Sequence, residues 1–516
     1  MLSINNMIWA KPKCNRMQAE MMSPSLDETI AVDHKIRRLE SLLRKIDWSS
    51  WEDKYDKMKG QPPIHPMLIA GVILYGLTER IRSSRDLEKA TKLRIDFMWF
   101  LHKRTIDHST FSAFNTRFKE ALKDLFKQLA LIALKENIEV GLAIDGTRFR
   151  SNSKRDGSLR TATIEERAEE LAQDLIKRHE QLKQVYIADN PDGATQDELT
   201  EEIARLQYQQ RKLAAALREG KKRDAAKKGK SDSRKASKAR TPITDPDSHV
   251  MNNKDGGSAP NYTPVAAADI NTGAILSASI ASGADEASMV EKAVADVKDI
   301  TGELPKKVLA DSSFASGQNL EALDRDGIEM YSSAGKTTKD NPAIREDVTS
   351  PVSKELWDKL PMKGKKSPVL DKEAFIYDSA QDCFYCPIGR KLDFYRNQTR
   401  KTKNYNVKVR EFRCNDCSGC PLAEKCLSRK AKRRMISRDE FEGHREKLRE
   451  HMSSDEAHEI YSKRAPVIEG VFAQIKHNMG IRGFVYRGID KVESEWLWIC
   501  SAFNLAKILK SMLKTG

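Results

Sequence analysis

The sequence predicts an α/β protein whose central sheet is assembled from segments that lie far apart in the chain. Two short apolar runs, GLAI before Asp145 and VLA before Asp311, have the length of buried strands, and each ends in a carboxylate. A third observation is the stretch 461–476, YSKRAPVIEGVFAQIK. Pro466 suits the first turn of a helix there, because that turn does not use the backbone N–H that proline lacks. We therefore expect two strands and a helix to meet around acidic side chains.

The composition indicates a globular protein with a polyanionic partner. At 516 residues the chain has room for roughly three domains, and 39% hydrophobic residues are enough to bury a core. The formal charge of +15 favours nucleic acid as the partner. No apolar run approaches about 18 residues, and the N-terminal segment lacks the basic-then-apolar order of a signal peptide. We therefore expect a cytoplasmic protein without a membrane segment.

Residues 1–135 are expected to form a helical N-terminal domain. The segment 67–77 is apolar nearly all round, which indicates a helix buried between other helices. A further helix is expected over 107–134. The basic residues around one segment, Arg82 and Arg85 among them, favour DNA binding. The solvated face of a dimerisation domain is the alternative.

Residues 163–241 are expected to be an insertion made of a helical hairpin, or coiled coil, and a basic linker. Two charged helical segments are separated by the turn-forming sequence DNPDG. Residues 220–241 contain ten Lys or Arg against two Asp and no large apolar side chain. We expect this linker to be disordered and able to lie along a phosphate backbone.

The remaining signals follow the order of a single α/β core. Residues 261–270 and 274–283 have strand patterns, a helix follows, and the VLAD strand is succeeded by a helix and a last strand. This order is that of a ribonuclease-H-like fold, a mixed sheet flanked by helices. The expected segments are the core at 136–162 and 242–334, a cysteine-rich insertion at 335–440 and the completion of the core at 441–516.

The helix expected around Glu469 carries two side chains suited to a metal and phosphate site. Val467, Val471 and Ile475 recur at helical spacing and form an apolar stripe for a core. Glu469 and Lys476 are seven residues apart, about two turns, so they share a second face. An ordinary surface pair is the alternative for these two residues.

Asp145, Asp311 and Glu469 together would make a hard-oxygen site for two divalent metals. Mg²⁺ and Mn²⁺ prefer carboxylate oxygens, whereas a nitrogen- or sulfur-rich site favours zinc. With two such ions, one lowers the pKa of an attacking water or 3′-hydroxyl and the other stabilises the leaving oxygen of an in-line phosphoryl displacement. A single Asp after a strand is more often a turn residue. The prediction therefore depends on all three carboxylates and on the basic charge of the chain.

Six of the eight cysteines lie in the cysteine-rich insertion, at spacings typical of a structural metal site. Paired CxxC motifs separated by about thirty residues predict a tetrahedral zinc held by four thiolates, with no open position for substrate. An iron–sulfur cluster is the chemical alternative. The candidate ligands are Cys383, Cys386, Cys414, Cys417, Cys420 and Cys426.

Several stretches of the chain resemble bacterial insertion-sequence transposases of the DDE type. They include LAIDGTRFRSNSK, TDPDSHVMNNKDG, VLADSSFASGQNLEAL, CSGCPLAEKC and YSKRAPVIEGVFAQIKHNMGIRGFVYRG, in the family's order. The resemblance implies that Asp145, Asp311 and Glu469 are the catalytic, metal-binding triad. It also implies that the basic side chains of the family's Tyr–Arg–Glu–Lys signature hold the phosphates of the element ends, and this signature corresponds to Tyr461, Arg464, Glu469 and Lys476.

One spacing departs from the family pattern. Glu469 follows Arg464 by five residues, one more than in better-known relatives, whereas Lys476 keeps the usual seven-residue separation from Glu469. Glu459 and Glu456 are the alternative carboxylates, but neither is followed by a comparable apolar stripe.

The resemblance implies a transposase that cuts element ends and joins the 3′-hydroxyl to target DNA. It would act on terminal inverted repeats in the bacterial nucleoid, as a homodimer or higher assembly, because two ends must be handled together. Arg482 and Arg487 are further candidates for phosphate contacts. The alternatives are a domesticated or inactive zinc-containing DNA-binding protein and a ribonuclease-H-type nuclease.

Overall fold

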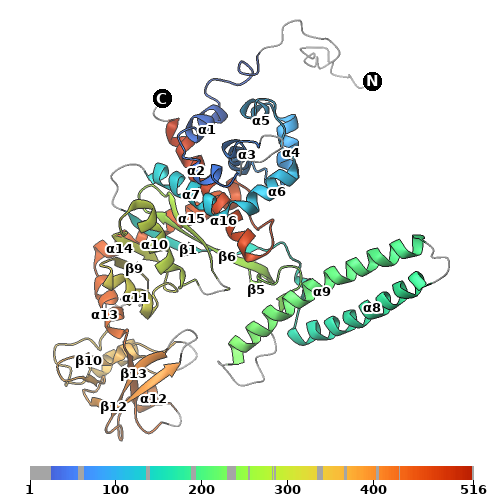
Figure 1. Ribbon diagram of the computed structural model, residues 1–516. Coiled ribbons are helices and arrows are strands. Elements are labelled where there is room, and N and C mark those ends of the chain that lie inside the picture. The colour runs from blue at the N-terminus through green and yellow to red at the C-terminus, as the bar shows by residue number, and fades with distance from the viewer. Residues whose placement is uncertain are drawn as a thin grey trace, which may run out of the picture. The chain divides into compact units, whose positions relative to one another are not determined.

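The computed structural model divides the chain into two compact units, Met1–Arg117 with Leu509–Gly516 and Phe118–Ile508 (Figure 1). Within the described residues, no helix is long and apolar enough to cross a membrane. The described residues are 25–513 except for gaps at 56–62, 135–139, 188–192, 229–239, 254–255, 282, 284–285, 334–340, 365–368, 402–405 and 429–430.

The first unit is built from helices around buried apolar side chains. α3 (Pro66–Thr78) begins with proline in its first turn and is buried along most of its length, as predicted. Ser83 caps α4 (Ser84–Leu93) by accepting the backbone N–H of Asp86. The other helices of this unit are α1 (Lys35–Leu43), α2 (Ser49–Glu52), α5 (Ile95–Phe100) and α6 (His108–Arg117). The single helix expected over 107–134 is two helices, α6 and α7 (Lys119–Leu134), the second of which belongs to the other unit.

The second unit contains a mixed sheet. Its main strands are β1 (Gly141–Gly146), β6 (Ser258–Asp269), β7 (Ile275–Ala281), β8 (Lys307–Ala310) and β9 (Glu329–Ser332). They lie in the order β7–β6–β1–β8–β9. β6 is antiparallel to β1 and β7, whereas β8 is parallel to both β1 and β9. The order of strands and helices expected from the sequence over this region is confirmed. Two-residue β2 (Phe149–Arg150) and β5 (His249–Asn252) extend the sheet along β6, and β3 (Ser158–Leu159) pairs with β4 (Thr241–Pro242).

Helices pack against this sheet and fix its edges. α10 (Met289–Thr301) packs against β7, and α15 (Arg464–Ala473) packs against β1 and β6. α10 ends at Gly302, whose φ of 81° is the left-handed conformation that closes many helices. The remaining helices of the core are α11 (Gly317–Arg325), α13 (Glu442–His451), α14 (Asp455–Ser462) and α16 (Ile489–Met512), with a 3₁₀ turn at Arg155–Gly157.

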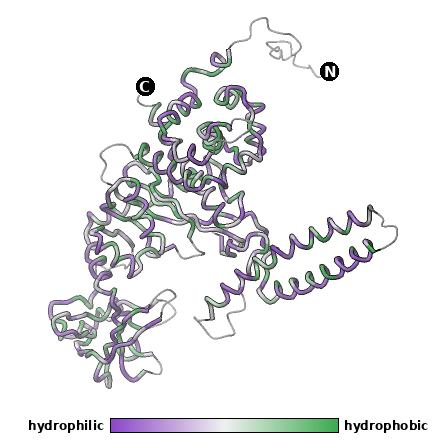
Figure 2. Tube along the Cα trace, in the orientation of Figure 1, coloured by the Kyte–Doolittle hydropathy of each residue, from purple (hydrophilic) through white to green (hydrophobic). Residues whose placement is uncertain are grey.

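α8 (Thr161–Ile187) and α9 (Gly193–Lys228) form the expected helical hairpin, which Figure 1 shows as two long helices side by side. Both are largely hydrophilic (Figure 2). The prediction of a disordered linker is wrong for 220–228, because these residues continue α9. Alanine and lysine there are good helix formers, and Thr161 Oγ1 donates a 2.6 Å hydrogen bond to Asp224 that joins the two helices. The rest of the predicted linker up to residue 239 lies outside the described residues.

The cysteine-rich insertion contains a five-stranded antiparallel sheet, which the sequence did not predict. Its strands are β10 (Ile376–Asp378), β11 (Cys383–Tyr385), β12 (Lys391–Lys401), β13 (Asn406–Cys414) and β14 (Met435–Asp439), in that order. These strands were not predicted, because β12 is exposed on both faces from Phe394 onward and its sequence therefore shows no alternation of apolar and polar residues. The insertion also contains α12 (Ala423–Cys426) and 3₁₀ turns at Lys354–Lys359 and Lys372–Ala374.

Candidate active site

Two carboxylates lie side by side at one end of the central sheet. In the parallel pair β1 and β8, Ile144 lies opposite Ala310, so Asp145 and Asp311 follow at adjacent positions. The carboxyl ends of parallel strands meet at one edge of a sheet, where ligand sites are commonly found. The Asp311 carboxylate accepts hydrogen bonds from the backbone N–H and the hydroxyl of Ser313, at 2.7 and 2.5 Å.

The environment of Asp145 disfavours its charge. Burial raises the pKa of this carboxyl, and the nearby negative charge of Asp311 adds to the effect. Two interactions work in the opposite direction. The Gly146 N–H donates to Asp145 Oδ1 at 2.8 Å, and Arg464 Nη1 lies 3.4 Å from Oδ2. This edge therefore concentrates negative charge that the protein only partly neutralises.

Arg464 and Lys476 reach this edge from one helical segment. Arg464 begins α15, and its guanidinium lies 5.9 Å from the ring of Tyr461 as well as against Asp145. Lys476 Nζ donates a 2.5 Å hydrogen bond to Thr147 Oγ1, two residues beyond Asp145. Lys476 lies in a π-helical turn, Gln474–Asn478, which extends the helix as the sequence predicts. Such turns are frequent at functional sites because they re-aim side chains.

Glu469 lies between these two cations on the same helical segment but contacts neither. It is exposed, and no other described residue forms a hydrogen bond or ion pair with it. The predicted apolar stripe needs correction: Val467 is only half-buried, and the buried residues of the segment are Ile468, Val471, Phe472 and Ile475. The face of the helix that packs on the sheet differs from the predicted one. Arg464 faces β1, so Ile468, one turn later, also lies against the sheet.

Glu286 is an acidic residue near this edge that sequence analysis missed. A Cβ on Gly146 would lie 2.5 Å from Glu286 Oε2, so glycine leaves room for that carboxylate. Glu286 pairs with Arg148 at 2.6 Å, and Arg148 also donates to Thr263 Oγ1 at 2.7 Å. The only signal in the sequence was the glycine directly after Asp145.

The other predicted phosphate contacts lie elsewhere. Arg487 donates to the carbonyl oxygen of Asn152 at 2.8 Å, which gives it a structural role. Arg482 is exposed, with Nη2 3.5 Å from His477 Nδ1. Arg82 is half-buried and Arg85 is exposed on α4, and both belong to the first unit.

Five of the six candidate zinc ligands gather around one apolar cluster in the insertion. Cys386, Cys414 and Cys426 are buried in it, and Cys417 and Cys420 pack against it. Backbone N–H groups of Ile388 and Arg390 donate to the Cys386 sulfur. Cys383 differs, because it alternates with Phe384 on β11, and its charged neighbours are Lys391, Asp378 and Asp393.

Two family models match the chain. Residues 385–509 match the transposase DDE domain, and residues 24–117 match a transposase domain (DUF772). The chain belongs to the insertion-sequence DDE transposases. No curated protein and no solved structure matches it. The first match includes Glu469 and Lys476, whereas Asp145 and Asp311 lie outside both matches.

The ligand types in this transposase suit two kinds of metal, but neither set is closed around an ion. Carboxylate oxygens at the sheet edge suit Mg²⁺ or Mn²⁺, and the thiols of the insertion suit zinc. In the described part of the transposase, three ligand atoms lie within 4.8 Å of one another only at Glu88, Asp107 and His108. Arg464 now occupies the side of Asp145 that faces α15.

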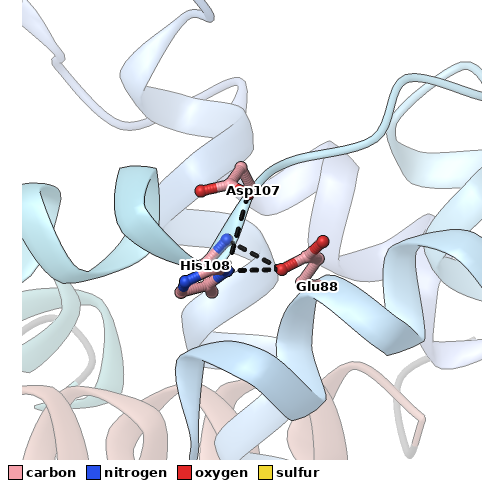
Figure 3. A group of neighbouring side chains, drawn as sticks. All are labelled: Glu88, Asp107 and His108. Atoms are coloured by element: carbon pink, nitrogen blue, oxygen red, sulfur yellow. Dashed lines mark hydrogen bonds and ion pairs between the residues drawn. The ribbon is translucent and has the colours of Figure 1, made fainter. Parts of the chain in front are cut away.

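The cluster of Glu88, Asp107 and His108 is a helix cap (Figure 3). Glu88 Oε2 accepts both the backbone N–H of His108, at 3.2 Å, and its ring Nδ1, at 2.7 Å, at the start of α6. Lys92 Nζ lies 2.5 Å from the other oxygen of Glu88. Because both oxygens have cationic or N–H partners, the cluster stabilises the junction of α4 and α6.

Proposed function

We propose that this transposase performs metal-dependent phosphoryl transfer at the ends of its element and joins the freed 3′-hydroxyl to target DNA. One observation carries the proposal: Asp145 and Asp311 end adjacent parallel strands, and Arg464 approaches Asp145 from α15. The strand order, with β6 antiparallel to a parallel set, supports a ribonuclease-H-like core within the predicted segments.

Asp145, Asp311 and Glu469 are proposed to hold two Mg²⁺ or Mn²⁺ ions. When bound, the ions would activate the attacking hydroxyl and stabilise the leaving oxygen. Glu469 is proposed as the third carboxylate because it is exposed on α15, the helix that packs against β1, and has no protein partner among the described residues. Arg464 would then be free to leave Asp145 and bind phosphate.

Lys476 is proposed to orient the edge from the same helical segment as Arg464, through its bond to Thr147. Its bond to Thr147 fixes the backbone directly after Asp145, and its charge would favour a phosphate there. Tyr461, Arg482, Arg85 and Arg82 are proposed as further DNA contacts, while the bond from Arg487 to Asn152 argues for an indirect role.

The insertion is proposed to hold a structural zinc ion, with four ligands drawn from Cys386, Cys414, Cys417, Cys420 and Cys426. Their gathering around a single apolar cluster supports this choice over one that includes Cys383. Zinc content of the purified protein, measured for wild type, Cys383→Ser and the double variant Cys386→Ser, Cys426→Ser, tests it. We expect loss of zinc only in the double variant, because removing any two of the five thiols removes at least one of the four ligands.

The protein is proposed to act as a dimer or higher assembly on element ends in the bacterial nucleoid. The second candidate is a DNA-binding protein without cleavage, which is favoured by the ion pair between Arg464 and Asp145, since it occupies the proposed metal side.

Strand nicking of a duplex that carries the element's terminal repeats distinguishes these candidates. Wild type, Glu469→Gln and the matched variant Glu459→Gln are compared with Mg²⁺ or Mn²⁺, and DNA binding is measured without metal. We expect only Glu469→Gln to lose cleavage, with binding unchanged in all three. Loss of cleavage in Glu459→Gln instead would transfer the role to that residue. Binding without cleavage by wild type would favour the second candidate.

A further inference from the structure

The outer half of the β12–β13 ribbon is exposed in a way that the rest of the insertion sheet is not. The two strands pair from Leu392 opposite Cys414 to Lys401 opposite Asn406. At the inner end, Leu392, Phe412 and Cys414 belong to the apolar cluster. Beyond Phe394 every residue of β12 is exposed, whereas β13 retains Val407 and Val409, which pack against Phe441. In the outer half, β13 therefore packs against Phe441, whereas β12 is exposed.

Three positive charges of this outer half have no ion-pair partner in the described part of the chain, whereas Arg410 in the same half pairs with Asp382. Among the described residues, none forms an ion pair with the side chains of Arg400, Lys401 or Lys408, although Glu440 Oε1 accepts the backbone N–H of Lys408 at 3.0 Å. Residues 394–401 and 406–410 contain no Asp or Glu. Toward the base of the ribbon the pattern changes, because Arg396 pairs with Glu411 at 2.7 Å. Arg400, Lys401 and Lys408 therefore form a group of cations without ion-pair partners among the described residues at the outer end.

Aromatic and amide side chains complete the surface. Tyr395, which is 43% exposed, is stacked against Arg413, with 3.9 Å between the guanidinium and the ring centre. This contact stiffens the base of the ribbon. Asn397 and Gln398 are exposed next to it, and neither side-chain amide is bonded to another described residue. Such amides read base edges, most often those of adenine.

We propose that the outer β12–β13 ribbon is a second DNA-binding element of the transposase, separate from the carboxylate edge, and this inference rests on the proposed function. Asn397, Lys401 and Lys408 share one face of the ribbon, because Asn397 and Lys401 are an even number of residues apart on β12 and Lys408 lies opposite Thr399 between them. Lys401 and Lys408 contact phosphates, and Asn397 faces a base edge. Gln398 and Arg400 lie on the other face, from which the longer Arg400 side chain reaches a neighbouring phosphate. A two-stranded ribbon fits the major groove of B-form DNA. The major groove of duplex RNA is too deep and narrow for side chains to read, so DNA is the partner.

The test is metal-free binding of full-length protein to the terminal-repeat duplex over a range of salt concentrations. The triple variant Arg400→Ala, Lys401→Ala, Lys408→Ala removes three proposed phosphate contacts, so the slope of log affinity against log salt should flatten by about 2 to 3. The matched control Lys298→Ala, Lys306→Ala, Arg325→Ala removes equal charge from exposed positions away from the ribbon and should keep the wild-type slope.

Further variants separate charge from base contacts. Arg400→Lys, Lys401→Arg, Lys408→Arg should restore the wild-type slope, which excludes misfolding as the cause of the loss. Asn397→Ala should reduce the preference for the terminal repeat over a scrambled duplex, with the slope unchanged, whereas Gln398→Ala, on the opposite face, should keep the preference. An unchanged slope in the alanine triple variant, or equal flattening in the control, overturns the proposal. Stronger binding to duplex RNA than to DNA also overturns it.

The two proposals fail in different ways. If wild type cleaves DNA with metal and the triple variant keeps an unchanged slope, the proposed function is supported and the DNA-binding role of the ribbon is refuted. If the slope flattens in the triple variant but wild type does not cleave DNA, the ribbon is supported as a DNA-binding element and the catalytic proposal is refuted.

Discussion

Two clusters of ionisable residues in the second unit are built in opposite ways. At the start of α13, the Glu442 carboxylate is 7% exposed and accepts from Lys372, Arg445 and Arg449 at 2.8 to 3.0 Å. Burial opposes its ionisation, but these cations outweigh burial and lower the pKa of Glu442 to about 2. At the sheet edge, burial instead raises the pKa of Asp145, and Arg464 is its one ion-pair partner among the described residues.

This difference supports the proposal that the sheet edge, and not the Glu442 cluster, holds the metal ions. A carboxylate surrounded by three cations has no capacity left for a metal, and its loss leaves buried positive charge uncompensated. Two adjacent carboxylates with a single cation are short of positive charge, which a divalent ion would supply. The balance of partners, rather than the number of acidic residues, is therefore the basis for proposing the sheet edge as the metal site.

Removing a carboxylate from the sheet edge should give the largest effect. We expect Asp311→Asn to reduce metal-dependent nicking by at least about 10³-fold, because several kcal/mol of charge stabilisation are lost. The amide keeps the shape of the side chain, so thermal unfolding should change little. Nicking that survives at the wild-type rate would show that the edge is not the site of cleavage.

Breaking the Glu442 cluster should instead lower the stability of the protein. Glu442→Ala leaves three cations without their shared partner and should destabilise this region by about 3 to 5 kcal/mol. Hydrogen exchange of α13 in the full-length protein measures the loss. Glu446→Ala serves as the control, since its carboxylate is 40% exposed and pairs with Arg438 alone, and it should cost under about 1 kcal/mol.

The same cluster predicts an acid limit of stability. The pKa of Glu442 is lowered from 4.5 to about 2, so its contribution is complete above pH 4.5 and is lost as pH falls toward 2. The shift corresponds to stabilisation on the order of 3 kcal/mol. Exchange rates of α13 measured from pH 5 to pH 2.5 should rise more steeply in wild type than in Glu442→Gln. Parallel profiles would contradict the assignment.

The smallest effect is expected at Gly146. In Gly146→Ala the new methyl group would lie 2.5 Å from Glu286 Oε2, so the carboxylate must shift and weaken its pair with Arg148. We expect a loss of about 1 kcal/mol in stability, measured by denaturant unfolding. Gly157→Ala is the control, because nothing lies within 4 Å of the added methyl and the position is outside the α-helices, where alanine itself would be stabilising. Equal stability of the two variants would mean that Glu286 moves without cost.

Much of the core was predictable because its signals are local. The runs before Asp145 and Asp311 are short and apolar, which is typical of buried strands, and Pro466 is typical of the first turn of a helix, here α15. The insertion sheet was not predictable, since an exposed ribbon such as β12 carries no alternation. The extension of α9 to Lys228 was missed because a basic composition masked residues of good helix propensity.

By itself, the sequence determined which residues end strands, which helix carries Glu469 and where the thiols concentrate, because these properties depend on neighbours in the chain. Only the tertiary structure decided that β1 and β8 are adjacent and parallel, which brings Asp145 beside Asp311. It also decided that Glu286 lies against Gly146 and that Cys383 lies apart from the other thiols. These relations depend on the pairing of distant segments, and pairing follows from packing of the whole sheet rather than from any local pattern.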